Sequence, residues 1–170
     1  MRIMIYITAI FLLAANVIAQ TSDRSMYKLA ETFEKGGDLE KAGAIYYELW
    51  GKNPANDDYF RGIVRTYKGL NKFKDLLPVI KRYISLKEST ESLALYAEIL
   101  WRTGDSKKAG EAWEAARMLK PKSPQTYKDI AESQITLRLF EKAVQTLEEG
   151  RSELDNIHLF ADLLSQLYIA

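Results

Sequence analysis

Three basic side chains share one face of a predicted helix in the first half of the chain. Arg61, Arg65 and Lys68 occupy positions i, i+4 and i+7, a spacing that brings side chains onto the same side of a helix. Guanidinium and ammonium groups arranged in this way can hold carboxylates through charge-assisted hydrogen bonds. The spacing therefore indicates a surface that binds an extended acidic segment of a partner.

Residue patterns that carry catalysis are weak in this sequence. His158 is its one histidine, and the absence of cysteine excludes a thiol nucleophile and a thiolate zinc site. The sequence GKNP at residues 51–54 lacks the upstream glycine and the following Ser or Thr of a phosphate-binding loop. We therefore expect no enzymatic activity, no metal site and no cofactor, and we expect His158 to be a surface or capping residue.

The overall charge is nearly balanced, with 24 Lys and Arg residues against 23 Asp and Glu residues. A protein that coats nucleic acid normally carries a strong basic excess, so we expect no nucleic-acid partner. The hydrophobic content of 47% is that of an ordinary globular protein, which is enough to build a core.

The beginning of the chain has the layout of a secretory signal peptide. One positive side chain precedes an uncharged apolar run over residues 3–15, and Val17 and Ala19 occupy the −3 and −1 positions of a cleavage site. We predict a signal peptide over residues 1–19 with cleavage after Ala19, a short linker over residues 20–22, and a secreted or periplasmic protein. The alternative is a retained membrane anchor, because a span needs roughly 17–25 apolar residues.

One stretch of sequence occurs twice, 67 residues apart. The copies are GDLEKAGAIYYELWGKNP at residues 37–54 and GDSKKAGEAWEAARMLKP at residues 104–121. The offset divides into 34 plus 33, and counting 34 residues on from Gly37 and from Gly104 reaches Asn71 and Arg138. Self-similarity at a fixed period of this size indicates stacked supersecondary units.

The segments between short turns have the periodicity of helices. Apolar side chains recur at spacings of three and four, and there is no sustained alternation of the kind a strand would show. Asp38 and Asp105 precede the second helix of their hairpins, and Ser123 precedes a proline at the first position of another helix. Pro78 lies inside a predicted helix, where we expect a kink or a late helix start. The sequence therefore predicts antiparallel helical hairpins.

The period and the helix–turn–helix content resemble those of the tetratricopeptide repeat (TPR) family. The resemblance implies an all-α fold, a right-handed α-solenoid of stacked hairpins. We expect repeats over residues 23–56, 57–90 (a degenerate copy), 90–123 and 124–157, with residues 158–170 forming a capping helix or the first helix of a fifth repeat. The apolar and small positions expected on the first helices are Leu29, Ala30, Ile63, Val64, Tyr96, Ala97, Ile130 and Ala131.

In the TPR family, partners usually bind the concave face that the first helices of successive repeats form. The resemblance places on this face the second, fifth, ninth and twelfth residues of each repeat. They are Arg24, Tyr27, Glu31 and Glu34; Asp58, Arg61, Arg65 and Lys68; Glu91, Ala94, Glu98 and Trp101; Gln125, Lys128, Glu132 and Ile135. The residues expected to bind the partner are Tyr27, Glu31, Arg61, Arg65, Lys68, Glu98, Trp101, Lys128 and Glu132.

Two details of this face bear on the ligand. Trp101 can supply an aromatic anchor for a partner. Alternatively, the basic side chains pair across the face with Glu31 and Glu98 and only keep it hydrated. The carboxylate clamp known in the family needs a Lys and an Asn at the fifth and ninth positions of one repeat, and no repeat here has that pair.

Taken together, the sequence indicates an extracytoplasmic scaffold that binds a peptide segment or a partner subunit. Two alternatives remain open. The chain is the N-terminal TPR portion of a larger envelope protein whose activity lies in a missing C-terminal region, or it is a scaffold tethered by an uncleaved N-terminal anchor. A membrane is a partner only if that N-terminal segment is retained.

Overall fold

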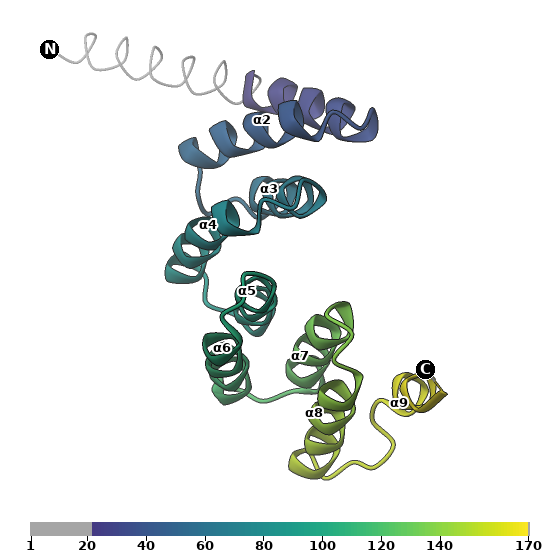
Figure 1. Ribbon diagram of the computed structural model, residues 1–170. Coiled ribbons are helices and arrows are strands. Elements are labelled where there is room, and N and C mark those ends of the chain that lie inside the picture. The colour runs from purple at the N-terminus through teal and green to yellow at the C-terminus, as the bar shows by residue number, and fades with distance from the viewer. Residues whose placement is uncertain (1–21, 170) are drawn as a thin grey trace, which may run out of the picture. The chain divides into compact units, whose positions relative to one another are not determined.

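The computed structural model describes residues 22–169, and this part of the chain is helical and contains no β-strand. Its helices are residues 22–35, α2 (Leu39–Lys52), α3 (Asp57–Gly69), α4 (Phe73–Leu86), α5 (Thr90–Arg102), α6 (Ser106–Met118), α7 (Pro124–Thr136), α8 (Phe140–Glu153) and α9 (Ala161–Ile169) (Figure 1). The predicted all-α fold class is thereby confirmed. The predicted signal peptide over residues 1–19 lies outside the described residues.

Two kinds of helix alternate along the chain. We call helix 22–35, α3, α5 and α7 the leading helices, and α2, α4, α6 and α8 the trailing helices. The chain forms two compact units, an N-terminal unit that ends at Lys72 and a C-terminal unit that begins at Phe73. The boundary falls between α3 and α4, inside the stretch 57–90 that the sequence marks as a degenerate repeat.

Four turns between a leading and a trailing helix share one backbone conformation. Gly37 and Gly104 have φ angles of 83° and 91°, and Asn71 and Arg138 have φ angles of 56° and 59°. These four residues are the ones reached by counting 34, 33 and 34 positions along the sequence. A positive φ is easy for glycine, tolerable for asparagine and unfavourable for arginine. The turn geometry therefore repeats even where the glycine does not.

The caps predicted for the trailing helices are present. The carboxylates of Asp38 and Asp105 each accept a hydrogen bond, at 3.2 Å, from the backbone N–H three residues on. Ser123 is the N-cap of α7, whose first residue is a proline. The two aspartates satisfy backbone donors that a helix start leaves open. At Ser123 it is the backbone N–H that donates, to Thr126 Oγ1 at 3.4 Å.

The expectation of a late helix start at Pro78 is wrong. Helix α4 begins at Phe73, so Pro78 is its sixth residue. The proline removes the hydrogen bond that the carbonyl of Lys74 would accept. Both Lys74 and Pro78 are exposed, so water can reach this carbonyl and the helix continues through the proline.

The core of the N-terminal unit forms where small residues meet a large ring. Ala30, Ala42, Tyr46 and Ile63 are fully buried. The ring of Tyr46 lies directly on the backbone of α3 at Gly62, where an added Cβ would come within 2.5 Å of the ring. Leu29, expected inside, is instead 43% exposed.

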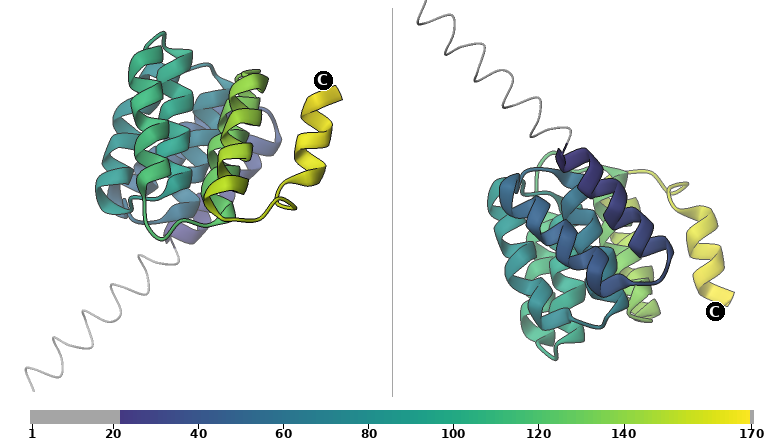
Figure 2. Two further views of the ribbon diagram at one scale, coloured as in Figure 1. Left: turned by 90° about the horizontal axis from the view of Figure 1, so that it is seen from below. Right: turned by 90° about the horizontal axis from the view of Figure 1, so that it is seen from above.

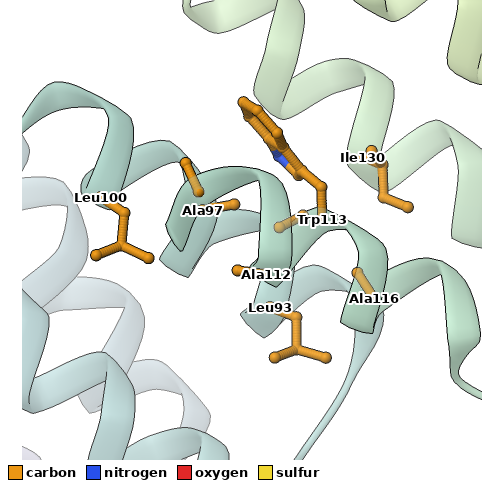
Figure 3. Packing of buried hydrophobic residues seen from close by; sticks show 9 residues of the cluster. Leu93, Ala97, Leu100, Ala112, Trp113, Ala116 and Ile130 are labelled. Carbon is orange, nitrogen blue, oxygen red and sulfur yellow. The ribbon is translucent and has the colours of Figure 1, made fainter. Parts of the chain in front are cut away.

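The core of the C-terminal unit lies between α5, α6 and α7. Figure 3 shows the small side chains of α5 and α6 facing one another, with the ring of Trp113 above them. The residues labelled there are Leu93, Ala97, Leu100, Ala112, Trp113, Ala116 and Ile130. Alanines at the crossing let the helices approach closely, and the large side chains fill the space beside them.

Helix α9 closes a second core cluster at the end of the C-terminal unit. Its Leu164 packs against Ala131 of α7 and Ala143 and Leu147 of α8, and Figure 2 shows the yellow α9 beyond the green helices α7 and α8. The helix begins at Ala161 rather than at residue 158, because Phe160 has a φ of 59°. Within residues 22–169, no helix has the length and apolar character needed to cross a membrane.

Candidate functional site

Arg65 is the centre of a polar network on the leading helices of the N-terminal unit. Its Nε and Nη2 atoms donate hydrogen bonds to the two carboxylate oxygens of Glu34 at 2.6 and 2.9 Å. The hydroxyl of Tyr46 donates a further hydrogen bond to Glu34 Oε2 at 2.7 Å. The Arg65 guanidinium also lies 5.9 Å from the centre of the Tyr46 ring. Arg65 thus holds a carboxylate, but the carboxylate belongs to its own chain.

The network shifts the acid–base properties of its members. The hydrogen bonds from Arg65 hold the pKa of the Glu34 carboxyl below its usual value, and the Tyr46 hydroxyl acts in the same direction. Burial, followed by the hydrogen bond to Glu34, raises the pKa of Tyr46. The bidentate pair of Arg65 and Glu34, with the buried hydroxyl of Tyr46, therefore links helix 22–35, α2 and α3 through hydrogen bonds.

The other predicted residues of this surface surround two clefts. Glu31 lies with Glu34, Lys35 and Arg65 on a cleft of about 340 Å³. Tyr27 lies on a second cleft of about 300 Å³, whose lining residues are Asp23, Arg24, Tyr27, Asn53, Asn56, Asp58 and Tyr59. Arg61 and Lys68 are on α3, Arg61 exposed and Lys68 partly buried. Both clefts therefore lie between one leading helix and the next.

The leading helices of the C-terminal unit, α5 and α7, border a cleft of a different character. It has a volume of about 170 Å³ and is lined by Glu91, Ala94, Leu95, Glu98, Asp129, Glu132, Ser133 and Thr136. Glu98 is buried and accepts a hydrogen bond from Arg102 Nε at 2.9 Å. Lys128 Nζ lies 3.7 Å from a carboxylate oxygen of Glu132. Glu98 and Glu132 thus each have a basic partner on the same helix.

The carboxyl of Asp129 in this cleft has a raised pKa. Burial is the main cause that raises its pKa, and the nearby carboxylates of Glu91 and Glu132 raise it further, against a hydrogen bond from Gln125. Burial and the neighbouring carboxylates thus both disfavour the charged form of Asp129. The acidic character of the α5–α7 cleft comes from the four carboxylates that line it.

Trp101, expected as an exposed aromatic anchor, is partly buried. It packs against the core cluster of the C-terminal unit, and its ring centroid lies 5.8 Å from that of Trp113. Its indole therefore contributes to the core in this structure.

A further cleft lies among α6, α7 and α8 and was not expected from the sequence. It has a volume of about 240 Å³. Gln134 Oε1 accepts a hydrogen bond from Thr146 Oγ1 at 2.9 Å at its base, and Trp113 Nε1 donates one to Ser133 Oγ at 2.8 Å nearby. Polar residues at otherwise apolar helix positions are the sequence signal that could have indicated it.

Several lining residues on the leading helices were also missed. Most of them lie one position past a residue assigned to the face; these are Lys35, Tyr59, Leu95, Asp129, Ser133 and Thr136. Polar and aromatic residues are consecutive around Tyr59 and Asp129 in the sequence. This pattern could have indicated that the exposed face of each leading helix is wider than one row of side chains.

The chemistry that these side chains offer is recognition by charge, hydrogen bonds and aromatic contact. Among residues 22–169, no three His, Cys, Asp or Glu side chains are grouped so that they could hold a metal ion. His158 lies in the exposed turn before α9, where its backbone N–H donates a hydrogen bond to Asn156 Oδ1 at 3.0 Å.

Comparisons with known proteins identify the fold. No protein-family model matches the sequence, and no curated protein matches it. A crystal structure of MamA is 17% identical with a TM-score of 0.55, covering 76% of this chain and 72% of that chain. MamA from Desulfovibrio magneticus RS-1 is 13% identical with a TM-score of 0.55, covering 76% and 74%. YrrB, a TPR protein with an unusual peptide-binding site, is 11% identical with a TM-score of 0.50, covering 90% and 89%. The chain therefore has the TPR-like, all-α fold that its sequence predicts.

Proposed function

We propose that this protein is a non-catalytic scaffold that binds a peptide segment or a partner subunit on the surfaces of its leading helices. The observation that carries this proposal is the position of the clefts. In the N-terminal unit two clefts lie between helix 22–35 and α3, and in the C-terminal unit one lies between α5 and α7. A hollow between neighbouring helices can receive the side chains of an extended segment that crosses them.

The charges on the leading helices of each unit limit the kind of peptide segment that can bind there. In the N-terminal unit, Arg61 and Lys68 share a face of α3 and are suited to an acidic segment. Arg65 already holds the carboxylate of Glu34 through its Nε and Nη2 atoms. In the C-terminal unit the cleft is rich in carboxylates. A partner segment that carries both signs of charge would complement the two units.

The similar structures support the same class of function. YrrB shares the fold and is described as having a peptide-binding site. Since the fold is a set of hairpins whose leading helices present side chains in series, peptide binding by a related arrangement is physically reasonable here.

The location of this activity outside the cytoplasm is part of the proposal. It rests on the apolar run over residues 3–15 followed by Val17 and Ala19 at signal-peptidase spacing. N-terminal sequencing of protein exported by its native cell tests it: a chain that starts at Gln20 supports export and cleavage, and a chain that starts at Met1 contradicts cleavage.

Site-specific photo-crosslinking in the native cell tests the binding surface. A photo-reactive amino acid replaces Arg61 or Glu132 on leading helices, and Lys81 or Glu111 serves as the matched exposed position on trailing helices α4 and α6. We expect one and the same protein partner to be captured from positions 61 or 132 and not from 81 or 111. Capture from the trailing-helix positions alone, or no protein capture from any position, would refute the proposal.

A charge reversal adds a quantitative check with the captured partner. Arg61→Glu on the leading helix α3 should weaken binding about tenfold, the effect of about 1.4 kcal/mol for a lost pair and a new repulsion. Lys81→Glu on α4 should leave the affinity unchanged. Equal effects of both variants would assign the binding to net charge instead of to the leading-helix surface.

A further inference from the structure

The cleft at Tyr27 in the N-terminal unit combines two aromatic rings with two carboxylates. Tyr27 comes from helix 22–35 and Tyr59 from α3, and their ring centroids lie 5.7 Å apart with planes inclined by 41°. Both side chains line the cleft of about 300 Å³ and are only partly buried. Aromatic rings that border a cavity in this way attract cations through their negative faces.

The charged groups that line this cleft are two carboxylates, Asp23 and Asp58, and one guanidinium, Arg24. Asp23 Oδ1 lies 3.2 Å from Lys52 Nζ, which also lies 3.2 Å from Glu48 Oε1, whereas the side chain of Asp58 is exposed. Burial is the main cause that raises the pKa of Tyr27 and Tyr59, and the charge of Asp58 raises both further. Both phenols therefore stay protonated, and their rings are neutral aromatic surfaces within reach of the Asp58 charge.

The helix ends at the cleft do not reverse this preference. The cleft lies near the N-terminal ends of helix 22–35 and α3, whose partial positive charges disfavour a cation. Two consecutive aspartates in the first turn of α3, and Asp23 in the first turn of helix 22–35, oppose that charge. The side chain of Asn56 accepts a hydrogen bond from the backbone N–H of Tyr59 at 3.1 Å, which satisfies one open donor of α3.

We propose that this cleft binds an arginine side chain of the peptide segment that the scaffold recognises. A planar guanidinium can stack on a tyrosine ring while its N–H groups donate to the carboxylate of Asp58. Arg24, which lines the same cleft, is placed to donate hydrogen bonds to the carbonyl oxygens of the peptide next to that arginine. Lysine suits the cleft less well, because a compact ammonium neither stacks nor makes a bidentate contact. The inference rests on the proposed function, since it names the chemistry of the partner.

The test uses small probes, so that it does not depend on a known partner. The full-length protein, with labelled tyrosine rings, is titrated with Nα-acetyl-arginine amide while the ring signals are followed by NMR. The control probe is Nα-acetyl-citrulline amide, which has the same shape and no charge. We expect the arginine probe to shift the signals of Tyr27 and Tyr59, to leave Tyr168 of α9 unchanged, and to bind at least fivefold more tightly than the citrulline probe.

Two variants identify the groups responsible. Asp58→Asn should weaken binding of the arginine probe about threefold to fivefold, the range of an exposed ion pair, whereas Asp75→Asn, in the first turn of α4, should have no effect. Tyr59→Leu should weaken binding about tenfold, and Tyr59→Phe should retain it because the ring remains. Asp58→Asn removes only the charge of an exposed side chain, so it keeps the test valid if Tyr59→Leu unfolds the unit.

Three results would overturn the assignment. They are equal binding of the arginine and citrulline probes, an unchanged affinity in Asp58→Asn, and stronger shifts of the same rings by Nα-acetyl-glutamate amide, which would identify an anion site at Arg24. The crosslinking experiment uses positions 61 and 132, which do not line this cleft. Probe binding without a crosslinked partner would therefore count against the proposed function alone, and a crosslinked partner without probe binding would count against the arginine site alone.

Discussion

Replacing Gly62 with alanine should destabilise the N-terminal unit, although alanine is the better helix former. Gly62 is the sixth residue of α3, and an alanine in a helix interior is favoured over glycine by about 1 kcal/mol. The new methyl group, however, would lie 2.5, 2.6 and 2.7 Å from three atoms of the Tyr46 ring. Ordinary carbon contacts are about 3.5–4.0 Å. The ring would therefore have to move by roughly 1 Å.

The surroundings of Tyr46 make that movement unfavourable. Its side chain is fully buried, and its hydroxyl donates the 2.7 Å hydrogen bond to Glu34. Overpacking of a core typically costs about 1–3 kcal/mol, and a strained hydrogen bond to a charged group adds about 1 kcal/mol. Against the gain of about 1 kcal/mol in helix propensity, the expected net destabilisation is about 2 kcal/mol.

Hydrogen exchange of the amides in α2 and α3 measures this effect in the affected unit. A loss of about 2 kcal/mol should speed exchange through opening of the unit about 30-fold. Gly110→Ala is the matched control, because Gly110 is also inside a helix but has no atom within 4 Å of an added Cβ, and it should stabilise α6 by about 1 kcal/mol. Adding Gly62→Ala to Tyr46→Leu should no longer destabilise. If Gly62→Ala slowed exchange as Gly110→Ala is expected to do, the contact between ring and backbone would be refuted.

Three further outcomes follow from polar contacts and turns. Arg65 lowers the pKa of Glu34, so the stability that the pair adds, about 1 kcal/mol, is complete above the usual carboxyl value of 4.5 and is lost as the pH falls through the lowered pKa of the folded protein. Urea titrations of wild type and Glu34→Gln should therefore differ at pH 7 and converge as the pH falls below that lowered pKa. Asp105→Ala should lose about 1 kcal/mol through the missing cap of α6, measured as a lower urea midpoint at pH 7. Arg138→Gly should raise the free energy of unfolding by about 1 kcal/mol, seen as a higher urea midpoint, because glycine relieves a φ of 59°. Gly104→Ala, at a φ of 91°, should lower the free energy of unfolding.

The repeat organisation could be predicted because it depends on local rules. Counting from two clear glycines identified Asn71 and Arg138 as turn positions, and the structure gives both of them a positive φ. Small residues at fixed positions predicted close helix approach, and Ala97 and Ala131 are fully buried. These features depend on spacing and residue size, which the sequence states directly.

The details of side-chain direction could not be predicted in the same way. Arg65 donates its hydrogen bonds to Glu34, which is 31 residues earlier. The sequence suggests an acidic partner segment, or Glu31 and Glu98, as the carboxylates that the basic side chains would bind. Leu29 occupies an expected core position but lies 43% exposed, and Leu164 was not singled out although it is the buried residue of α9. Each of these depends on the rotation of one helix against its neighbour, and a rotation of a few tens of degrees exchanges which side chain lies inside.

The shared left-handed turns have a consequence for how this chain tolerates change. Glycine, asparagine and arginine all occupy the same turn position, so substitutions there alter stability without altering the path of the chain. Insertion of one residue into a hairpin is different, because each residue rotates a helix by about 100° and would carry every packed alanine of that helix away from its neighbour. At these turns the architecture is thus more sensitive to the number of residues than to their identity.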